Sequence, residues 1–204
     1  MTSEPIRDPL TDHLLTPQNC TLVIIDYQPN QIQVVTSMDR DLLVRNIVWV
    51  ARTARTYGLP IVLSTVGVAN GSKPTIPELK KVLADSSEID RTAINAWEDV
   101  EFRQAVEATG RKKLIMTALW TEVCLAFPSL DALRAGYEIY PVVDAVAGTS
   151  PEAHRAGLER VVQAGAQPIS WVSLACELQR DWARQDTVPE IFDIVLTSRL
   201  LKAA

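Results

Sequence analysis

The chain has 204 residues, of which 47% are hydrophobic and 22% are charged, and its net charge is −5. This length fits one α/β domain, and the composition supplies a substantial core and excludes a disordered chain. We find no basic stripe with interleaved aromatic residues, so nucleic acid is not expected as a partner. The longest apolar runs have the length of strands, so neither a membrane span nor a signal peptide is predicted.

Residues 1–19 contain three prolines and are expected to form an extended arm. Beyond the arm, short apolar runs alternate with segments whose apolar residues have helical spacing. Strands are predicted at residues 21–25, 60–65, 113–118, 137–143 and 167–171. Helices are predicted at residues 39–57, 77–84, 100–109, 121–135, 151–164, 173–185 and 189–201. Several of these helices are followed by glycine, which is a common helix terminator.

The regular alternation of strands and helices predicts an α/β fold, a three-layer αβα sandwich around a mostly parallel, Rossmann-like sheet. No internal repeat or linker interrupts the pattern, so residues 20–204 are expected to form one domain. The three cysteines, Cys20, Cys124 and Cys176, are widely spaced and form no CxxC motif. This usage indicates reduced thiols and a cytoplasmic location, with Cys20 and Cys176 interpreted as structural residues.

Three residues are expected to meet at the carboxyl edge of the sheet, where open α/β sheets bind ligands. Asp26 ends the first strand, Arg91 follows Glu88–Asp90, and Cys124 lies in the first turn of the helix after the central strand. A helix N-terminus favours a thiolate over a thiol. A thiolate beside a carboxylate and a cation could attack a carbonyl, with the carboxylate moving the proton.

Each of these residues also has a structural interpretation. An aspartate at a strand end is often a helix or turn cap, a lone cysteine is often a small core residue, and an arginine is usually a solvated surface charge. Taken singly, none of the three identifies a site.

The order and spacing of three motifs resemble the isochorismatase-like cysteine hydrolase family, over nearly the whole chain from Cys20 onward. The motifs are Leu22–Gln28, Arg91–Trp97 and Leu119–Leu125. The last motif, with its Thr-x-x-Cys, is the most specific. The residues within these motifs look most similar to those of an uncharacterised hydrolase branch of the family, whose members often form higher oligomers.

The resemblance implies a triad of Asp26, Cys124 and a cationic residue at position 91. It also implies a cis peptide between Leu119 and Trp120, with the backbone N–H groups of Trp120 and Cys124 holding an oxyanion. The residues expected to bind the substrate are Gln28, Asn95, Trp97, Thr121 and Phe127.

The chain departs from the family pattern at two positions. Arg91 stands where the family has lysine, and a bidentate arginine pair would make Asp26 a poorer base. Trp120 is bulkier than the usual residue and indicates a narrowed pocket. The two histidines, His13 and His154, are far apart and form no Asp-x-His motif, so no metal is expected. No glycine-rich phosphate loop is present, so no nucleotide cofactor is expected.

The sequence therefore predicts a metal-independent cysteine hydrolase that acts on a small amide-like substrate. Two alternatives remain open, a vinyl-ether hydrolase of the isochorismatase type and a non-catalytic oligomeric scaffold that keeps the fold. Five tryptophans and the apolar C-terminal segment 191–196 favour a homo-oligomer.

Overall fold

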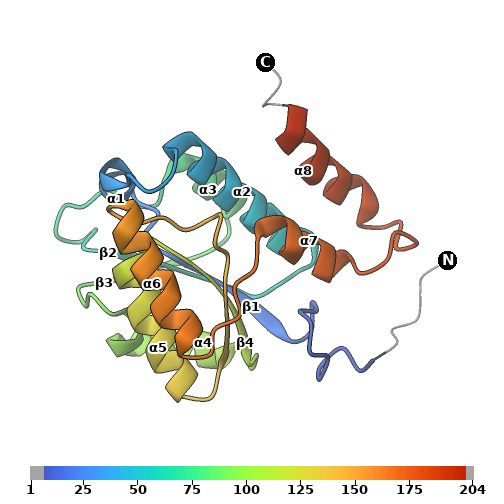
Figure 1. Ribbon diagram of the computed structural model, residues 1–204, viewed down its shortest axis with the longest axis horizontal. Helices are drawn as coiled ribbons and strands as arrows, with labels where there is room; N and C mark the ends of the chain where they lie inside the picture. Colours follow the sequence, from blue (N-terminus) through green and yellow to red (C-terminus); the bar gives the residue numbers. More distant parts are fainter. Residues whose placement is uncertain (1–6, 201–204) are drawn as a thin grey trace.

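A computed structural model describes the backbone of residues 7–200 and the side chains of residues 7–195 (Figure 1). Five strands form one sheet in the order β3-β2-β1-β4-β5, and every neighbouring pair is parallel. The strands are β1 (Cys20–Ile25), β2 (Ile61–Val66), β3 (Glu88–Arg91), β4 (Lys113–Ala118) and β5 (Glu138–Pro141). All residues of β1 and β4 are buried, as expected for central strands covered on both faces.

Helices cover both faces of the sheet and enclose two separate hydrophobic cores. The helices are α1 (Pro29–Val34), α2 (Arg40–Thr56), α3 (Pro77–Val82), α4 (Val100–Ala108), α5 (Ala126–Arg134), α6 (Pro151–Gln163), α7 (Trp171–Gln179) and α8 (Val188–Leu200). One core contains residues of α2, α3, α7 and α8, and the other contains residues of α4, α5 and α6. The predicted three-layer αβα fold is confirmed.

Several predicted boundaries were wrong. Neither α1, which begins at Pro29, nor β3, whose four residues include three charged ones, was predicted. The strand expected at residues 167–171 is a single bridge between Val142 and Ile169. The helix expected at residues 173–185 ends at Gln179, because Arg180 adopts a left-handed backbone with φ of 61°.

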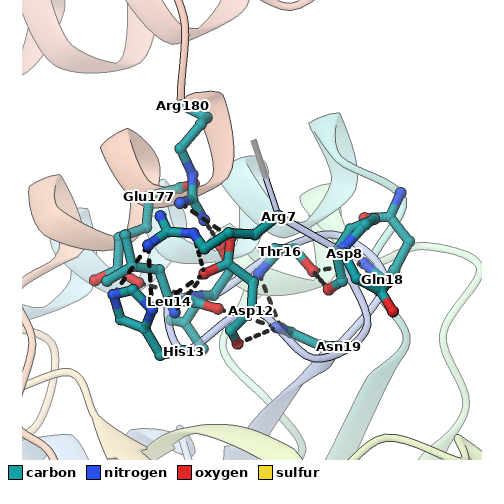
Figure 2. Close-up of polar contacts among 12 residues, drawn as sticks. Arg7, Asp8, Asp12, His13, Leu14, Thr16, Gln18, Asn19, Glu177 and Arg180 are labelled. Carbon is teal, nitrogen blue, oxygen red and sulfur yellow. Dashed lines mark hydrogen bonds and ion pairs between the residues drawn. The ribbon is translucent and has the colours of Figure 1, made fainter. Parts of the chain in front are cut away.

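The N-terminal segment is compact rather than extended, because residues 7–19 form turns that dock against α7 and the start of β4 (Figure 2). The buried Asp12 carboxylate pairs with Arg180 at 3.2 Å, and Glu177 accepts a hydrogen bond from the Leu15 backbone at 2.8 Å. From β4, the buried Lys113 Nζ donates to the carbonyl oxygens of three consecutive arm residues at 2.7–3.3 Å. Three charge-assisted bonds of this kind fix the arm to the sheet.

The strand order reverses at β1, since the chain proceeds from β1 through β2 to β3 on one side and then adds β4 and β5 on the other. The carboxyl ends of β1 and β4 therefore lie side by side at the edge where open α/β sheets bind ligands. Asp26 follows β1 directly, and the segment that contains Cys124 follows β4. Within the described residues, no helix is both long and apolar enough to cross a membrane.

Candidate active site

Asp26 is completely buried and holds an unusual backbone conformation, with φ of 63°. A residue with a side chain reaches this left-handed region at a cost of about 1 kcal/mol, so the surroundings must impose it. The Asp26 N–H donates to Ser64 O at 2.9 Å, and its carbonyl accepts from the Gln28 N–H at 2.8 Å. These two bonds turn the chain sharply at the end of β1 and fix the Asp26 carboxyl group at the carboxyl edge of the sheet.

Arg91 is also buried, and it reaches Asp26 from two strands away. It is the last residue of β3, and β2 lies between β3 and β1. Neighbouring strands are about 4.8 Å apart, so the Arg91 side chain crosses roughly twice that distance. Its Nη2 donates to Asp26 Oδ2 at 2.5 Å, and its Nη1 donates to the carbonyl of Ala93. Both side chains of the ion pair are fully shielded from solvent.

The Arg91 guanidinium meets the Asp26 carboxylate through one oxygen, so the bidentate pair considered from the sequence is not formed. Among the described residues, Asp26 Oδ1 and Arg91 Nε have no hydrogen-bond partner. A favourable interaction with the Cys124 thiol lowers the pKa of Asp26. Desolvation outweighs it and the Arg91 charge, so the pKa of Asp26 is raised. Asp26 thus joins the cation to the thiol.

Cys124 lies in η2 (Thr121–Leu125), a single π-helical turn between β4 and α5. The turn follows a cis peptide between Leu119 and Trp120, where the family resemblance places one. Leu119 N–H donates to Ile25 O at 3.1 Å, which ties the turn to the end of β1. On the other side, the Trp120 indole N–H donates to Gln31 O at 2.9 Å. Both anchors hold Cys124 beside Asp26.

The prediction that Cys124 rests as a thiolate was wrong. Burial, the charge of Asp26 and the hydrogen bond to Asp26 raise the pKa of the Cys124 thiol to about 12. The Arg91 charge and the Trp120 backbone act in the opposite direction but do not outweigh them. A helix N-terminus alone therefore does not fix the ionisation of a thiol when a carboxylate lies against it. In neutral solution Cys124 is therefore a thiol, and the proton acceptor beside it is Asp26.

Gln28 was predicted to bind the substrate, but its side-chain amide is used within the protein. It is fully buried, with Oε1 accepting from the Val66 N–H at 2.9 Å and Nε2 donating to Lys73 O at 2.6 Å. Gln28 thereby secures the loop after β2 against the end of β1. Its role as a substrate contact stays a prediction.

Asn95 and Trp97 were predicted to bind the substrate. Trp97 lies in the 3-10 turn η1 (Ala96–Glu98), and Asn95 directly precedes this turn. Asn95 caps this turn through a 3.1 Å bond from the Trp97 N–H, and its Nδ2 donates to Asp131 at 2.7 Å. Trp97 is buried in the same core cluster as Cys124, and its ring meets Tyr137 edge-on at 5.3 Å. Trp97 and Cys124 thus belong to the same hydrophobic core, and the roles of Asn95 and Trp97 in substrate binding stay predictions.

Thr121 and Phe127 are occupied by contacts with α6. The fully buried Thr121 hydroxyl lies 2.8 Å from His154 Nδ1, and the Phe127 ring lies beneath the Arg160 guanidinium at 5.8 Å. Their predicted role as substrate contacts remains untested.

The sequence interpretation missed the groups that clamp η2 from the outside. Glu122 Oε1 accepts hydrogen bonds from the N–H and hydroxyl of Thr149 at 3.0 and 2.7 Å. Gly157 on α6 permits close backbone contact, because a Cβ there would lie 2.8 Å from Glu122 Cα. Glu122 lies inside the Thr-x-x-Cys motif, but its partners come from a loop and a helix about 30 residues later in the chain. No local sequence pattern connects Glu122 to these partners.

The other two cysteines have different environments. Cys20 is buried, as predicted, and its pKa is raised to about 12 mainly by burial. Cys176 was predicted to lie on an apolar face but is exposed on α7. No group of three or more possible metal-ligating side chains occurs in the part of the chain that the structure describes.

Residues 20–173 match the profile of the isochorismatase domain. The probable hydrolase YcaC of Escherichia coli is 37% identical over 170 residues, which cover 82% of this chain and 81% of that protein. The solved structure of Escherichia coli YcaC, described as an octameric hydrolase of unknown specificity, superposes with a TM-score of 0.82 at 30% identity. The superposition covers 98% of this chain and 100% of the Escherichia coli chain.

A second solved structure is YcaC from Pseudomonas aeruginosa with hexane-2,5-diol and covalent acrylamide. Its TM-score is 0.82 at 32% identity, with coverage of 92% of this chain and 98% of that one. A nicotinamidase from Bacillus subtilis, at 19% identity and a TM-score of 0.66, shares the fold.

Replacement of Asp26 by asparagine should lower the pKa of Cys124 from about 12, because the Asp26 carboxylate raises it through both charge and hydrogen bonding. We expect a decrease of about one to three pH units, which is typical for a close charge. The ultraviolet absorbance of the thiolate, measured across pH against a Cys124→Ser baseline, reports the change. A Cys124 pKa in Asp26→Asn as high as in the unmodified protein would show that the carboxylate does not contact the thiol.

Proposed function

The chain belongs to the isochorismatase family of hydrolases, and from this premise we propose that it is a metal-independent cysteine hydrolase acting on a small amide-like substrate. The observation that carries the proposal is the buried pair of Asp26 and Arg91 at 2.5 Å, together with Cys124 near enough that it and Asp26 shift each other's pKa. A nucleophile, a proton acceptor and a permanent cation within one group are the parts that acyl transfer requires.

In the proposed reaction, Cys124 Sγ attacks the substrate carbonyl carbon while its proton passes to Asp26. The carbonyl oxygen becomes an oxyanion, which the backbone N–H groups of Trp120 and Cys124 stabilise. The C–N bond then breaks, and Asp26 returns the proton to the departing amine. Water attacks the resulting thioester, Asp26 takes a proton from the water, and this proton returns to Cys124 as the thiol leaves.

Arg91 keeps a positive charge beside Asp26 at every stage, because a guanidinium does not deprotonate in proteins. Its single contact leaves Asp26 Oδ1 available to the thiol. The lysine of the family pattern and Arg91 would therefore perform the same electrostatic task. The resting thiol, with its pKa raised to about 12, is converted to a nucleophile only while Asp26 accepts its proton.

The Pseudomonas relative supports this chemistry, because its structure contains covalent acrylamide. Acrylamide is a small amide with an electrophilic carbon, and a covalent adduct requires a nucleophile in that protein. In this chain, Cys124 is the thiol that lies beside a base.

Replacement of Cys124 by alanine or serine should reduce kcat/KM on a responsive small amide by about 1000-fold or more, because the covalent step is lost. A panel of small aliphatic and aromatic amides, followed by ammonia release, provides the measurement. Cys176→Ser is the matched control, because Cys176 is exposed and distant from the proposed chemistry. Turnover that survives Cys124→Ala would instead favour vinyl-ether hydrolysis, which needs an acid and a water but no thiol.

We also propose that the chain forms a homo-oligomer through the outer side of α8. The inner side is docked, since Ile191 and Ile194 are buried and Arg52 on α2 pairs with Glu190 and Asp193 at 2.6 and 2.8 Å. The outer side carries Phe192, whose ring pairs with Trp182 of the segment between α7 and α8; the ring centroids are 5.1 Å apart and Trp182 and Phe192 are 52% and 44% exposed. Figure 1 shows α8 at the periphery of the molecule.

A second copy of this chain is the proposed occupant of the aromatic pair, and the octameric state of Escherichia coli YcaC supports it. Large aromatic side chains are enriched at interface hot spots. The proposed location is the cytoplasm, where the cysteines, all of them free thiols, would stay reduced.

A Trp182→Ala/Phe192→Ala variant should therefore dissociate at higher protein concentration than the unmodified chain. Loss of a hot spot worth about 2 kcal/mol weakens assembly about 30-fold. Analytical ultracentrifugation over a concentration series measures this change. Leu10→Ala is the control, because Leu10 is 63% exposed but lies in the N-terminal segment. Identical assembly of the aromatic variant and the control would place the interface elsewhere.

A further inference from the structure

We propose that His154 is a positioning residue for the turn that carries Cys124, and that protonation of its imidazole releases this turn and lowers the reactivity of the thiol. The inference rests on the proposed function, because it concerns the same nucleophile. His154 contacts no reacting group, and its effect is exerted through Thr121.

The first observation is the bond between α6 and η2. His154 Nδ1 lies 2.8 Å from Thr121 Oγ1, and Thr121 is fully buried. Thr121 directly follows the cis peptide and begins the π turn, and its N–H is already bonded to Ala147 O at 2.9 Å. The hydroxyl contact is thus a second, independent anchor on the residue that sets the direction of the turn.

The second observation is the closeness of the two elements. Gly157 lies one helical turn after His154, and a Cβ at that position would lie 2.8 Å from Glu122 Cα and 3.0 Å from the Thr121 carbonyl carbon. The backbones of α6 and η2 are therefore in direct contact, with no side chain between them to absorb a shift. A change in the His154 bond is transmitted to the turn rather than lost in flexible packing.

The third point is the protonation state of the imidazole. A neutral imidazole with its proton on Nε2 accepts the Thr121 hydroxyl proton at Nδ1, whereas a protonated imidazole has donors at both nitrogens. Burial lowers the pKa of His154, although the charge of Glu122 opposes this effect. His154 is accordingly neutral in neutral solution, and in the tautomer with its proton on Nε2 it accepts the Thr121 hydroxyl proton at Nδ1.

A competing partner for the protonated ring is already in place. Glu122 Oε2 is buried and has no hydrogen-bond partner among the described residues, while Oε1 is held by Thr149. A protonated His154 no longer accepts the Thr121 hydroxyl proton and can keep the bond only by donating from Nδ1. The attraction of the ring to the Glu122 carboxylate competes with that reversed bond. Glu122 is the charged group whose effect on His154 is resolved. The other titratable residues of α6 and of the α5 helix packed against it are Glu152, Arg155, Glu159, Arg160, Asp131 and Arg134.

The test compares His154→Asn, His154→Leu and the neighbouring control Arg155→Asn, all in a Cys176→Ser background. Asparagine places an amide near the position of Nδ1 and can bond to Thr121, but it does not titrate. Arg155 is exposed on the same helix. The first readout is the rate of acrylamide addition to Cys124 across pH, followed by the mass of the intact protein. The second is hydrogen exchange of the amides of residues 119–127.

In neutral solution, His154→Leu should react about tenfold more slowly than the unmodified protein, as expected for one lost hydrogen bond, while His154→Asn stays close to it. The ratio of the unmodified rate to the His154→Asn rate should stay constant above pH 6.5, the ordinary pKa of histidine, and fall only below it. The titration of Asp26 is common to both proteins and cancels in this ratio. Hydrogen exchange in η2 should be faster in His154→Leu than in Arg155→Asn.

A ratio that does not change with pH, or a His154→Leu protein with unmodified reactivity and exchange, would overturn the inference. Failure of the proposed function has a different signature. In one outcome, Cys124 of the unmodified protein never reacts, while hydrogen exchange in η2 is faster only in His154→Leu. This result would confirm that His154 anchors η2 and would reject Cys124 as a nucleophile. Unchanged exchange together with normal Cys124 chemistry would reject the His154 inference alone.

Discussion

The site depends on a buried charge pair. Asp26 and Arg91 are both removed from water and touch through one oxygen and one nitrogen. Desolvation of two charges costs several kcal/mol for each, so such a pair is weak evidence for stability, and removal of either partner is strongly destabilising. Its functional consequence is clearer. The fixed cation opposes the rise in the pKa of Asp26 that burial produces, which favours the ionised carboxylate needed to receive the thiol proton.

The fold builds this pair from segments that are distant in the sequence. Asp26 is held at the carboxyl edge of the sheet by its left-handed backbone after β1, and Arg91 reaches it across β2. Cys124 approaches from the opposite side, because β4 lies next to β1 where the strand order reverses. The π turn that carries Cys124 is clamped between the end of β1, α1 and α6. The proposed chemistry therefore lies where the ends of β1 and β4 meet α1 and α6.

The sequence alone predicted the layers and the convergence of Asp26, Arg91 and Cys124, because hydrophobic periodicity and parallel topology together place strand ends at one edge. It could not predict β3, a short charged strand, or the commitment of Gln28 to the loop after β2. The ionisation of Cys124 was predicted wrongly. The helix N-terminus is visible in a sequence, but the contact with Asp26 that raises the thiol pKa is a tertiary feature. For the same reason, His154 gave no signal as a partner of Thr121.

The most direct test of the account is the reactivity of Cys124 toward acrylamide in Arg91→Lys and Arg91→Met. Lysine keeps a positive charge beside Asp26, whereas methionine leaves a buried carboxyl unpaired and raises its pKa, so that it holds its own proton. We predict that the folded Arg91→Lys protein stays within about tenfold of the unmodified rate and that Arg91→Met falls by about 100-fold or more. A folded Arg91→Met protein that reacts as fast as Arg91→Lys would contradict the account.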